Sequence, residues 1–451
     1  MSPRASSSPQ PSAGDSRAHG SGHLRLLEGG GRGSGIVAAS ARHRDVISTR
    51  VAVLTLTGVL CAVGLVMVLS ASAYTSLEYY GSVWTIFERQ VLWMALGALA
   101  LIVTARVHYQ RWRRMRMLIL IGTLGLLLAV LVPGVGVSAG GSSRWIGVGL
   151  FRLQPSELMK LAIALFAADL LARRAKRVRE ARAVVLPLLI VLGLAGTLVL
   201  AQPDMGTALV LACISFALLY AGGVPLRPVL KGLAAVAVVG LIVGLAEPYR
   251  RARLLSFVDP FAHAKGSGYQ VVQSLVGLGS GHLYGLGLGG GREKWGLLPN
   301  AHTDFIFSVI GEEGGLVGTI LVLALFAALA WYGFRAATRA PDRFGALLAV
   351  ACTSWITGQA VINIGAVIGL LPVTGIPLPF ISFGGSSLVI TMIAAGILVN
   401  IAFHEQVPVV SAPAVRSSAR LPARSVARST RSSTPPPTHR RPAEPTPRGT
   451  R

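Results

Sequence analysis

Asp304 is the residue best placed for acid–base chemistry, because it lies where a long Gly-rich polar loop meets the start of an apolar helix. A carboxylate at the water-facing end of a membrane helix is costly to keep without a role. At that point it is positioned to accept a proton from a substrate. The alternative is structural, since Asp304 also suits the positive end of a helix that His302 or Thr303 caps. The sequence therefore predicts chemistry at a membrane surface.

Basic side chains are frequent on the loop at 248–304. Cations on the outer side of a membrane need an anionic partner, and a diphosphate is the obvious candidate. The alternative partner is the headgroup of an outer-leaflet phospholipid. The many glycines between 277 and 291 have no defined phosphate-binding spacing, so they predict a flexible or re-entrant loop. The basic residues are Arg250, Arg251, Arg253, Lys265, Arg292 and Lys294.

Three further charged residues, Arg144, Glu157 and Lys160, lie around the start of a predicted helix at Pro155. Proline suits the first turn of a helix, and an acid is stabilised near the same end by the helix dipole. Glu157 and Lys160 are three residues apart, so a structural ion pair between them is as good an interpretation as a functional one.

The segment at 369–387 is largely apolar, yet its prolines and glycines exclude a helix. It predicts a re-entrant loop. Irregular backbone at membrane depth is tolerated only where it is buried in protein or lines a cavity. We therefore expect a concave outer face, with Ser386 or Ser387 capping the last helix.

The composition predicts the elements that carry these residues. Of 451 residues, 52% are hydrophobic and 13% are charged, which indicates an all-α polytopic integral membrane protein. About ten stretches are long enough to cross a bilayer. They lie near 51–71, 91–105, 115–133, 158–172, 184–201, 205–222, 232–246, 305–333, 346–371 and 386–403.

Clusters of Lys and Arg alternate with the predicted spans, and such clusters mark the cytoplasmic side. This pattern predicts that both termini are cytoplasmic and that 248–304 is an extracytoplasmic loop between spans 7 and 8. The formal net charge of +24 then reflects topology and attraction to anionic lipid, and not nucleic-acid binding. Residues 1–47 and 404–451 are rich in Ser, Pro and Arg and are predicted to be disordered tails around a domain at 48–403.

Five short motifs occur along the chain in a fixed order. They are Arg144-Trp145-Ile146 with Gln154-Pro155-Ser156-Glu157, Gln202-Pro203-Asp204-Met205-Gly206-Thr207, Gly268-Tyr269-Gln270 with Gln273-Ser274, Ala301-His302-Thr303-Asp304-Phe305, and Asn363 through to Gly384-Gly385-Ser386-Ser387. With these motifs in this order, the chain resembles the SEDS family of membrane proteins (shape, elongation, division and sporulation) over roughly 48–403. The sequence at 310–313 and the long basic tails are more similar to the FtsW type of cell division than to the RodA type.

The resemblance implies a peptidoglycan glycosyltransferase that polymerises lipid II, a disaccharide-pentapeptide on an undecaprenyl diphosphate carrier, at the outer face of the plasma membrane during cell division. It implies an inverting hexosyl transfer in which Asp304 is the general base and Arg250 and Arg253 bind the diphosphate. In the same cavity it implies supporting or substrate-binding roles for Arg144, Glu157, Lys160, Gln270 and Ser386.

Two positions depart from the family pattern, since Gly296 and Asn300 stand where related proteins often carry an acid. A divalent cation such as Mg²⁺ or Mn²⁺ beside Asp304 is left open, and no other cofactor is implied. The implied partners are lipid II, the lipid bilayer, a class B penicillin-binding protein and, through the tails, other division proteins. The implied location is the bacterial plasma membrane at the division septum.

Other functions also fit a chain of this kind: a lipid II flippase or transporter, a RodA-type elongation polymerase, or a scaffold for a penicillin-binding protein. Ion-coupled transport requires ionisable groups inside the spans. Asp169, Glu312 and Glu313 are almost the only ones here, and we expect the two glutamates to form a structural network. A scaffold does not explain the outer carboxylate and cations.

Overall fold

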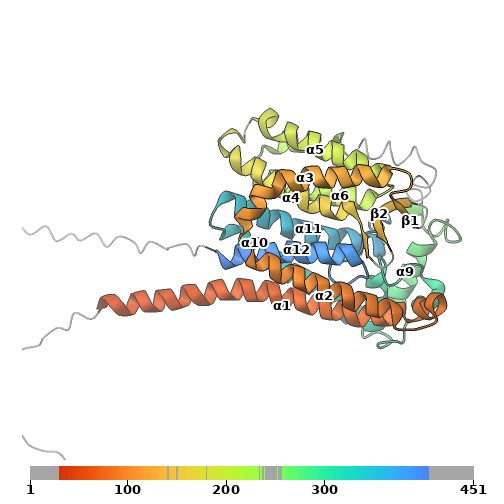
Figure 1. Ribbon diagram of the computed structural model, residues 1–451. Helices are drawn as coiled ribbons and strands as arrows, with labels where there is room; N and C mark the ends of the chain where they lie inside the picture. The colour runs from red at the N-terminus through yellow and green to blue at the C-terminus, as the bar shows by residue number, and fades with distance from the viewer. Residues whose placement is uncertain are drawn as a thin grey trace, which may run out of the picture. The chain divides into compact units, whose positions relative to one another are not determined.

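The computed structural model describes residues 30–139, 142–148, 151–178, 180–232, 234–235, 238, 251 and 256–405. Within these ranges the protein is a bundle of long helices that run side by side, with short strands and loops gathered at one end (Figure 1). Side chains of α1 are described from Thr49 onward.

The predicted apolar stretches at 51–222 and 305–403 are helical. Among the described residues, seven helices have the length and hydropathy of a membrane span. The other two are α4, which carries Glu157, Lys160 and Asp169, and α6, which is shorter. The predicted span at 232–246 lies largely outside the described residues. The helices are α1 (Gly30–Tyr80), α2 (Thr85–Arg106), α3 (Tyr109–Leu131), α4 (Pro155–Arg173), α5 (Ala181–Ala201), α6 (Met205–Ala221), α10 (Ile306–Thr338), α11 (Arg343–Val367) and α12 (Gly385–Phe403).

The helix α1 begins at Gly30, within the range that the sequence assigns to the N-terminal tail. The apolar part that is long enough to cross a membrane runs from Thr49 to Tyr80. The second predicted tail lies outside the described residues from 406 onward.

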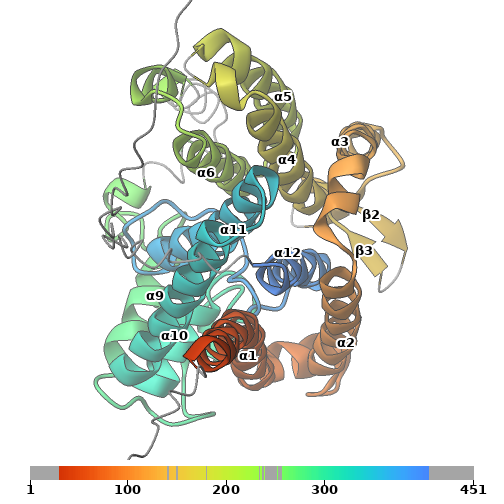
Figure 2. The same ribbon diagram turned by 90° about the vertical axis from the view of Figure 1, so that its left-hand side faces the viewer.

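The helix α12 is the most buried of the candidate spans and packs against α1, α2, α4, α10 and α11 (Figure 2). The peripheral helices instead expose large apolar side chains, such as Leu118 on α3, Ile190 on α5 and Trp331 on α10. A helix that is apolar on all sides is stable only in a protein core or in lipid. The bundle is therefore that of an integral membrane protein.

The end of the bundle that carries Asp304 contains structure that the all-α expectation did not include (Figure 1). Three short strands, β1 (Val137–Ala139), β2 (Ser142–Val148) and β3 (Phe151–Leu153), form an antiparallel sheet in the order β1-β2-β3. Val137 pairs with Trp145, and Ile146 pairs with Leu153. The loop predicted to be flexible contains α9 (Tyr269–Ser280) and a π-helical turn, η2 (Glu293–Leu297).

The Pro/Gly segment between α11 and α12 is non-helical, as predicted, and is buried in the protein at Ile376, Leu378 and Phe380. Gly64 of α1 lies directly against it. A Cβ atom on Gly64 would be 2.6 Å from the Phe380 carbonyl oxygen. Glycine therefore allows α1 to approach the backbone of this segment.

Candidate active site

Asp304 lies in the turn at 301–305, just before α10, and its side chain is half-buried. The N-cap residue of α10 is Phe305, and the helix has no side-chain cap. The expectation that His302 or Thr303 caps this helix is therefore wrong. The Thr303 hydroxyl instead donates to Asp304 Oδ1 at 2.9 Å. The carboxylate is thus held in the turn ahead of the helix.

Asn363 of α11 fixes the main chain at Asp304. Its Nδ2 donates to the Asp304 carbonyl oxygen at 2.7 Å and to the Ile376 carbonyl oxygen at 2.8 Å. A Cβ atom on Gly375, whose φ is +69°, would lie 3.9 Å from Asp304 Oδ2. The buried side-chain amide of Asn363 therefore links the main chain of Asp304 to the Pro/Gly segment, and this segment lies beside the Asp304 carboxylate.

Glu157 and Lys160 form a buried network behind the Pro/Gly segment. Lys160 Nζ lies 2.6 Å from Glu157 Oε2, so the predicted i, i+3 ion pair is confirmed. Lys160 also donates to Gln359 Oε1 at 2.8 Å, and Gln359 Nε2 donates to the Pro377 carbonyl oxygen at 2.9 Å. Because the Lys160 side chain is fully buried, we assign to this pair the role of supporting the segment beside Asp304.

Asp204 caps α6 and accepts hydrogen bonds from neutral groups at the start of α4. Its carboxylate accepts from Thr207 N at 3.0 Å, Thr207 Oγ1 at 2.8 Å, Ser156 Oγ at 2.9 Å and Gln154 Nε2 at 3.0 Å. The side chain is buried. These hydrogen bonds provide what a buried carboxylate requires, and they join the starts of α4 and α6.

Arg144 of β2 holds the turn that leads into α6. Its Nε donates to the Gln202 carbonyl oxygen at 2.9 Å, and its Nη2 donates to the Pro203 carbonyl oxygen. The first turn of α6, which follows, packs on the Pro/Gly segment, since a Cβ atom on Gly206 would be 2.8 Å from the Thr374 carbonyl oxygen. Arg144 therefore has partners within the protein, and its predicted contact with substrate stays a prediction.

The structure brings Ser386 close to this group but not as a helix cap. The N-cap of α12 is Gly384, and no side chain caps the helix. Ser386 Oγ accepts from Gln154 N at 3.3 Å, while Ser387 Oγ donates to Glu157 Oε2 at 2.9 Å. Both serines therefore bind α4, which corrects the expected capping role.

The other predicted substrate-binding residues lie on the loop between 248 and 304. Gln270 is half-buried in the first turn of α9. Arg250 and Arg253, the predicted diphosphate clamps, lie outside the described residues. Their role stays a prediction.

Lys294, grouped above with the loop cations that need an external anion, has an anionic partner inside the protein. Its Nζ lies 2.6 Å from Glu313 Oε1 and donates to Ser70 Oγ at 2.8 Å. Glu312 accepts from Arg292 N at 2.6 Å. The predicted structural network of Glu312 and Glu313 is therefore confirmed, and it attaches the loop at η2 to α1 and α10.

Two groups near this loop have shifted pKa values. Burial lowers the pKa of His302 to about 4, so its imidazole is neutral at physiological pH and adds no positive charge beside Asp304. Burial, and then the nearby Glu312 carboxylate, raise the pKa of Glu293 to about 7. Glu293 is a residue that the sequence did not single out, because no spacing predicts its burial.

In the part of the chain that the structure describes, no three His, Cys, Asp or Glu side chains are arranged to hold a metal ion. The described residues therefore offer no protein-only ligand set for a divalent cation.

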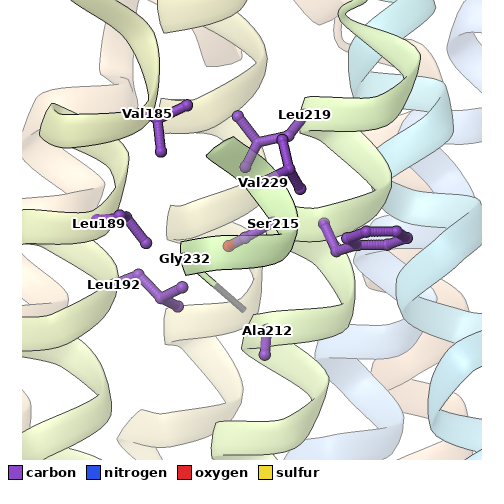
Figure 3. A pocket seen from close by; sticks show the side chains of 9 residues that line it. Val185, Leu189, Leu192, Ala212, Ser215, Leu219, Val229 and Gly232 are labelled. Atoms are coloured by element: carbon purple, nitrogen blue, oxygen red, sulfur yellow. The ribbon is translucent and has the colours of Figure 1, made fainter. Parts of the chain in front are cut away.

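Two pockets lie in other parts of the molecule. One is apolar and lies between α5, α6 and the residues from Val229 to Gly232, with Ser215 as its polar side chain (Figure 3). The other, of about 480 Å³, is lined by residues of α1, the turn between α1 and α2, and the η2 loop, including Ser70, Trp84 and Lys294. Asp304 lines neither pocket, so a concave surface above it stays a prediction.

The sequence did not predict the partners of Asn363, Gln359 and Asp204, although Asp204 and Asn363 lie in two of the five motifs. Lys160 and Gln359 are 199 positions apart, and Asn363 and Asp304 are 59 apart. No local spacing indicates such contacts.

Comparison with known proteins gives consistent results. The model of the family of FtsW, RodA and SpoVE, described as cell cycle protein, matches residues 51–407. A probable peptidoglycan glycosyltransferase FtsW of Mycobacterium tuberculosis is 43% identical over 353 residues, which are 78% of this chain and 67% of that protein. Stage V sporulation protein E of Bacillus subtilis is 40% identical over 353 residues, covering 78% of this chain and 96% of that protein.

Two solved structures are similar in fold. One comes from work described as the structural coordination of polymerization and crosslinking by a peptidoglycan synthase complex. It has a TM-score of 0.66 and 28% identity, and the match covers 78% of this chain and 96% of that chain. The other is the rod shape determining protein RodA of Thermus thermophilus, with a TM-score of 0.57 and 27% identity over 78% of this chain and 95% of that one.

Proposed function

Because the chain belongs to the FtsW, RodA and SpoVE family of cell cycle proteins, we propose that it is a peptidoglycan glycosyltransferase of cell division whose general base is Asp304. Relatives about 40% identical over most of the chain carry the name peptidoglycan glycosyltransferase. The substrate we propose is lipid II, presented from the outer leaflet of the plasma membrane.

The reaction needs one base and a stabilised leaving group. The acceptor hydroxyl attacks the anomeric carbon of the donor sugar and loses its proton to Asp304. The bond from that carbon to the diphosphate oxygen breaks, and the configuration at the carbon inverts. The diphosphate leaves as an anion and needs no proton, so cations stabilise it. We assign this role to Arg250 and Arg253.

The observation that carries the assignment is the contrast between Asp304 and the acids near it. Glu157, Asp204, Glu312 and Glu313 are at most 3% exposed and are bonded to buried donors. Asp304 is only half-buried, and its main chain is fixed by Asn363. A base must meet substrate while its position is held, and Asp304 alone of these five combines both properties.

We propose a class B penicillin-binding protein as the partner that cross-links the product. The similar structure from a complex that performs polymerization and crosslinking supports this pairing. We place both termini in the cytoplasm, supported by the basic clusters beside the spans. We place the protein at the division septum, where its tails bind other division proteins.

The test is polymerisation of purified lipid II by the reconstituted protein with its cognate penicillin-binding protein. The native chain is expected to form glycan strands, and Asp304→Asn to form none while folding normally. Asp259→Asn is the matched control, because Asp259 is an exposed acid on the same loop that bonds Ala262 N. Equal polymer from Asp304→Asn and the control would refute the base. No polymer from any chain, with lipid II translocation instead, would favour the flippase.

A further inference from the structure

Three arginines converge on the single carboxylate of Asp169. Arg113 Nε lies 2.7 Å from Oδ1, Arg116 Nε lies 2.5 Å from Oδ2, and Arg173 Nε lies 2.8 Å from Oδ2. The Asp169 side chain is only 4% exposed. Three positive charges share one negative charge, so the cluster keeps an excess of two positive charges.

This cluster lies far from the candidate active site. Asp169 follows Pro155, the first residue of α4, by 14 positions, which correspond to about 21 Å along a helix. The start of α4 contacts Asp204 and the first turn of α12, whereas Asp169 lies near the last turn of α4. If Asp304 faces the outside, the arginine cluster is at the cytoplasmic membrane surface. This location rests on the proposed function.

The three arginines keep N–H groups that are available to a ligand, although each is anchored to Asp169. A guanidinium has five N–H groups, and each of the three uses Nε for Asp169. Among the described residues, the further acceptor of a terminal nitrogen is the Arg113 carbonyl oxygen, which receives Arg116 Nη1 at 2.8 Å. The side chains of Arg113, Arg116 and Arg173 are 30%, 18% and 55% exposed to solvent.

Among the described residues, these three arginines form ion pairs with Asp169 alone. Asp342 instead bonds the Tyr109 hydroxyl and Gln110 Nε2, and Glu180 is exposed. Further cations nearby in the sequence increase the positive charge at this end of α3 and α4. They are Arg111, Arg114, Arg174, Lys176, Arg177 and Arg182.

We propose that Arg113, Arg116 and Arg173 form a binding site for a phosphate-bearing anion, supplied either by an anionic phospholipid headgroup or by a soluble phosphate. The planar guanidinium matches phosphate geometry through paired N–H groups. The Asp169 anchor, together with the Phe344 ring 5.1 Å from the Arg113 guanidinium, orders these side chains before the ligand arrives. Such preorganisation lowers the entropic cost of binding. Scattered surface arginines lack this anchor.

The experiment titrates short-chain phosphatidylglycerol, phosphatidylcholine or inorganic phosphate into the purified full chain in neutral detergent. Thermal unfolding is followed by tryptophan fluorescence, because a ligand of the folded state raises the unfolding temperature. About 0.5 M NaCl suppresses general surface attraction. The test variant is Arg173→Gln. The control is Arg177→Gln, which removes an exposed arginine of the following turn that lies outside the cluster.

Phosphatidylglycerol is expected to raise the unfolding temperature of the native chain, with phosphatidylcholine inactive. The half-saturating concentration should be about fivefold higher for Arg173→Gln and unchanged for Arg177→Gln. The same pattern with inorganic phosphate, and no added effect of the lipid, would identify a soluble phosphate as the ligand. No shift with either anion, or equal losses in both variants, would overturn the site. None of these results depends on polymerisation, so the proposed function is tested separately.

Discussion

The side-chain amide of Asn363 lies 2.7 Å from the main-chain oxygen of Asp304. The same amide nitrogen donates to the Ile376 carbonyl oxygen at 2.8 Å, so one residue of α11 sets the distance between the candidate base and the Pro/Gly segment. Buried backbone carbonyls need such partners. The position of Asp304 therefore depends on a contact that involves neither the Asp304 side chain nor substrate.

Asn363→Ala is expected to reduce polymerisation at least tenfold, because it releases the main chain at Asp304. It also leaves the buried Ile376 carbonyl oxygen without this donor, which costs ~1–3 kcal/mol of stability. Asn400→Ala is a matched control. Asn400 is equally buried, and its amide joins Tyr109 N and the Ala105 carbonyl oxygen. Both variants should unfold at similarly lowered temperatures, and only Asn363→Ala should lose activity beyond its loss of folded protein. Equal activities per folded molecule would contradict this coupling.

Gly206→Ala tests the contact between α6 and the Pro/Gly segment. A Cβ atom there would lie 2.4 Å from Ile376 Cγ2 and 2.8 Å from the Thr374 carbonyl oxygen, so the segment beside Asp304 must shift. We expect a polymerisation rate at least tenfold lower, since small misplacements in an active site have large effects. Gly193→Ala in α5 has open space around it and should be neutral, or stabilising by ~0.5–1 kcal/mol. A fully active Gly206→Ala would show that the segment tolerates this shift.

The sequence alone predicted the features that follow from a local pattern of residues. Apolar runs predicted the helices, including α4 with its three charged residues, and the junction of a polar loop with an apolar helix identified Asp304. The sequence did not predict contacts between distant parts of the chain, such as the hydrogen bond between Lys160 and Gln359. The strands at 137–153 were missed because they are short and rich in Gly and Ser, so they lack the alternation that indicates a strand. Lys294 was misassigned because charge alone does not indicate burial.

Lys160→Met is expected to destabilise the protein by ~3–5 kcal/mol, because it leaves the buried Glu157 carboxylate without its cation. The double variant Glu157→Gln with Lys160→Met should recover most of that loss, since no charge is then buried. The measurement is the temperature at which each purified variant loses its monodisperse size-exclusion peak. A double variant no more stable than Lys160→Met would show that the ion pair is not the reason for the loss.

Glu293 should make the stability of the η2 loop depend on pH. In the folded chain, burial and then the Glu312 carboxylate raise the pKa of Glu293 from its ordinary value of 4.5 to about 7. Between these pH values the folded state binds more protons than the unfolded state, so stability falls as pH rises. The contribution is fully present below pH 4.5 and is lost as pH rises through about 7. Glu293→Gln stays neutral, so its unfolding temperature should lack this decline and exceed that of the native chain above pH 7. Glu180→Gln, an exposed change outside this loop, should keep the native profile, and identical profiles for both variants would exclude Glu293 as the source.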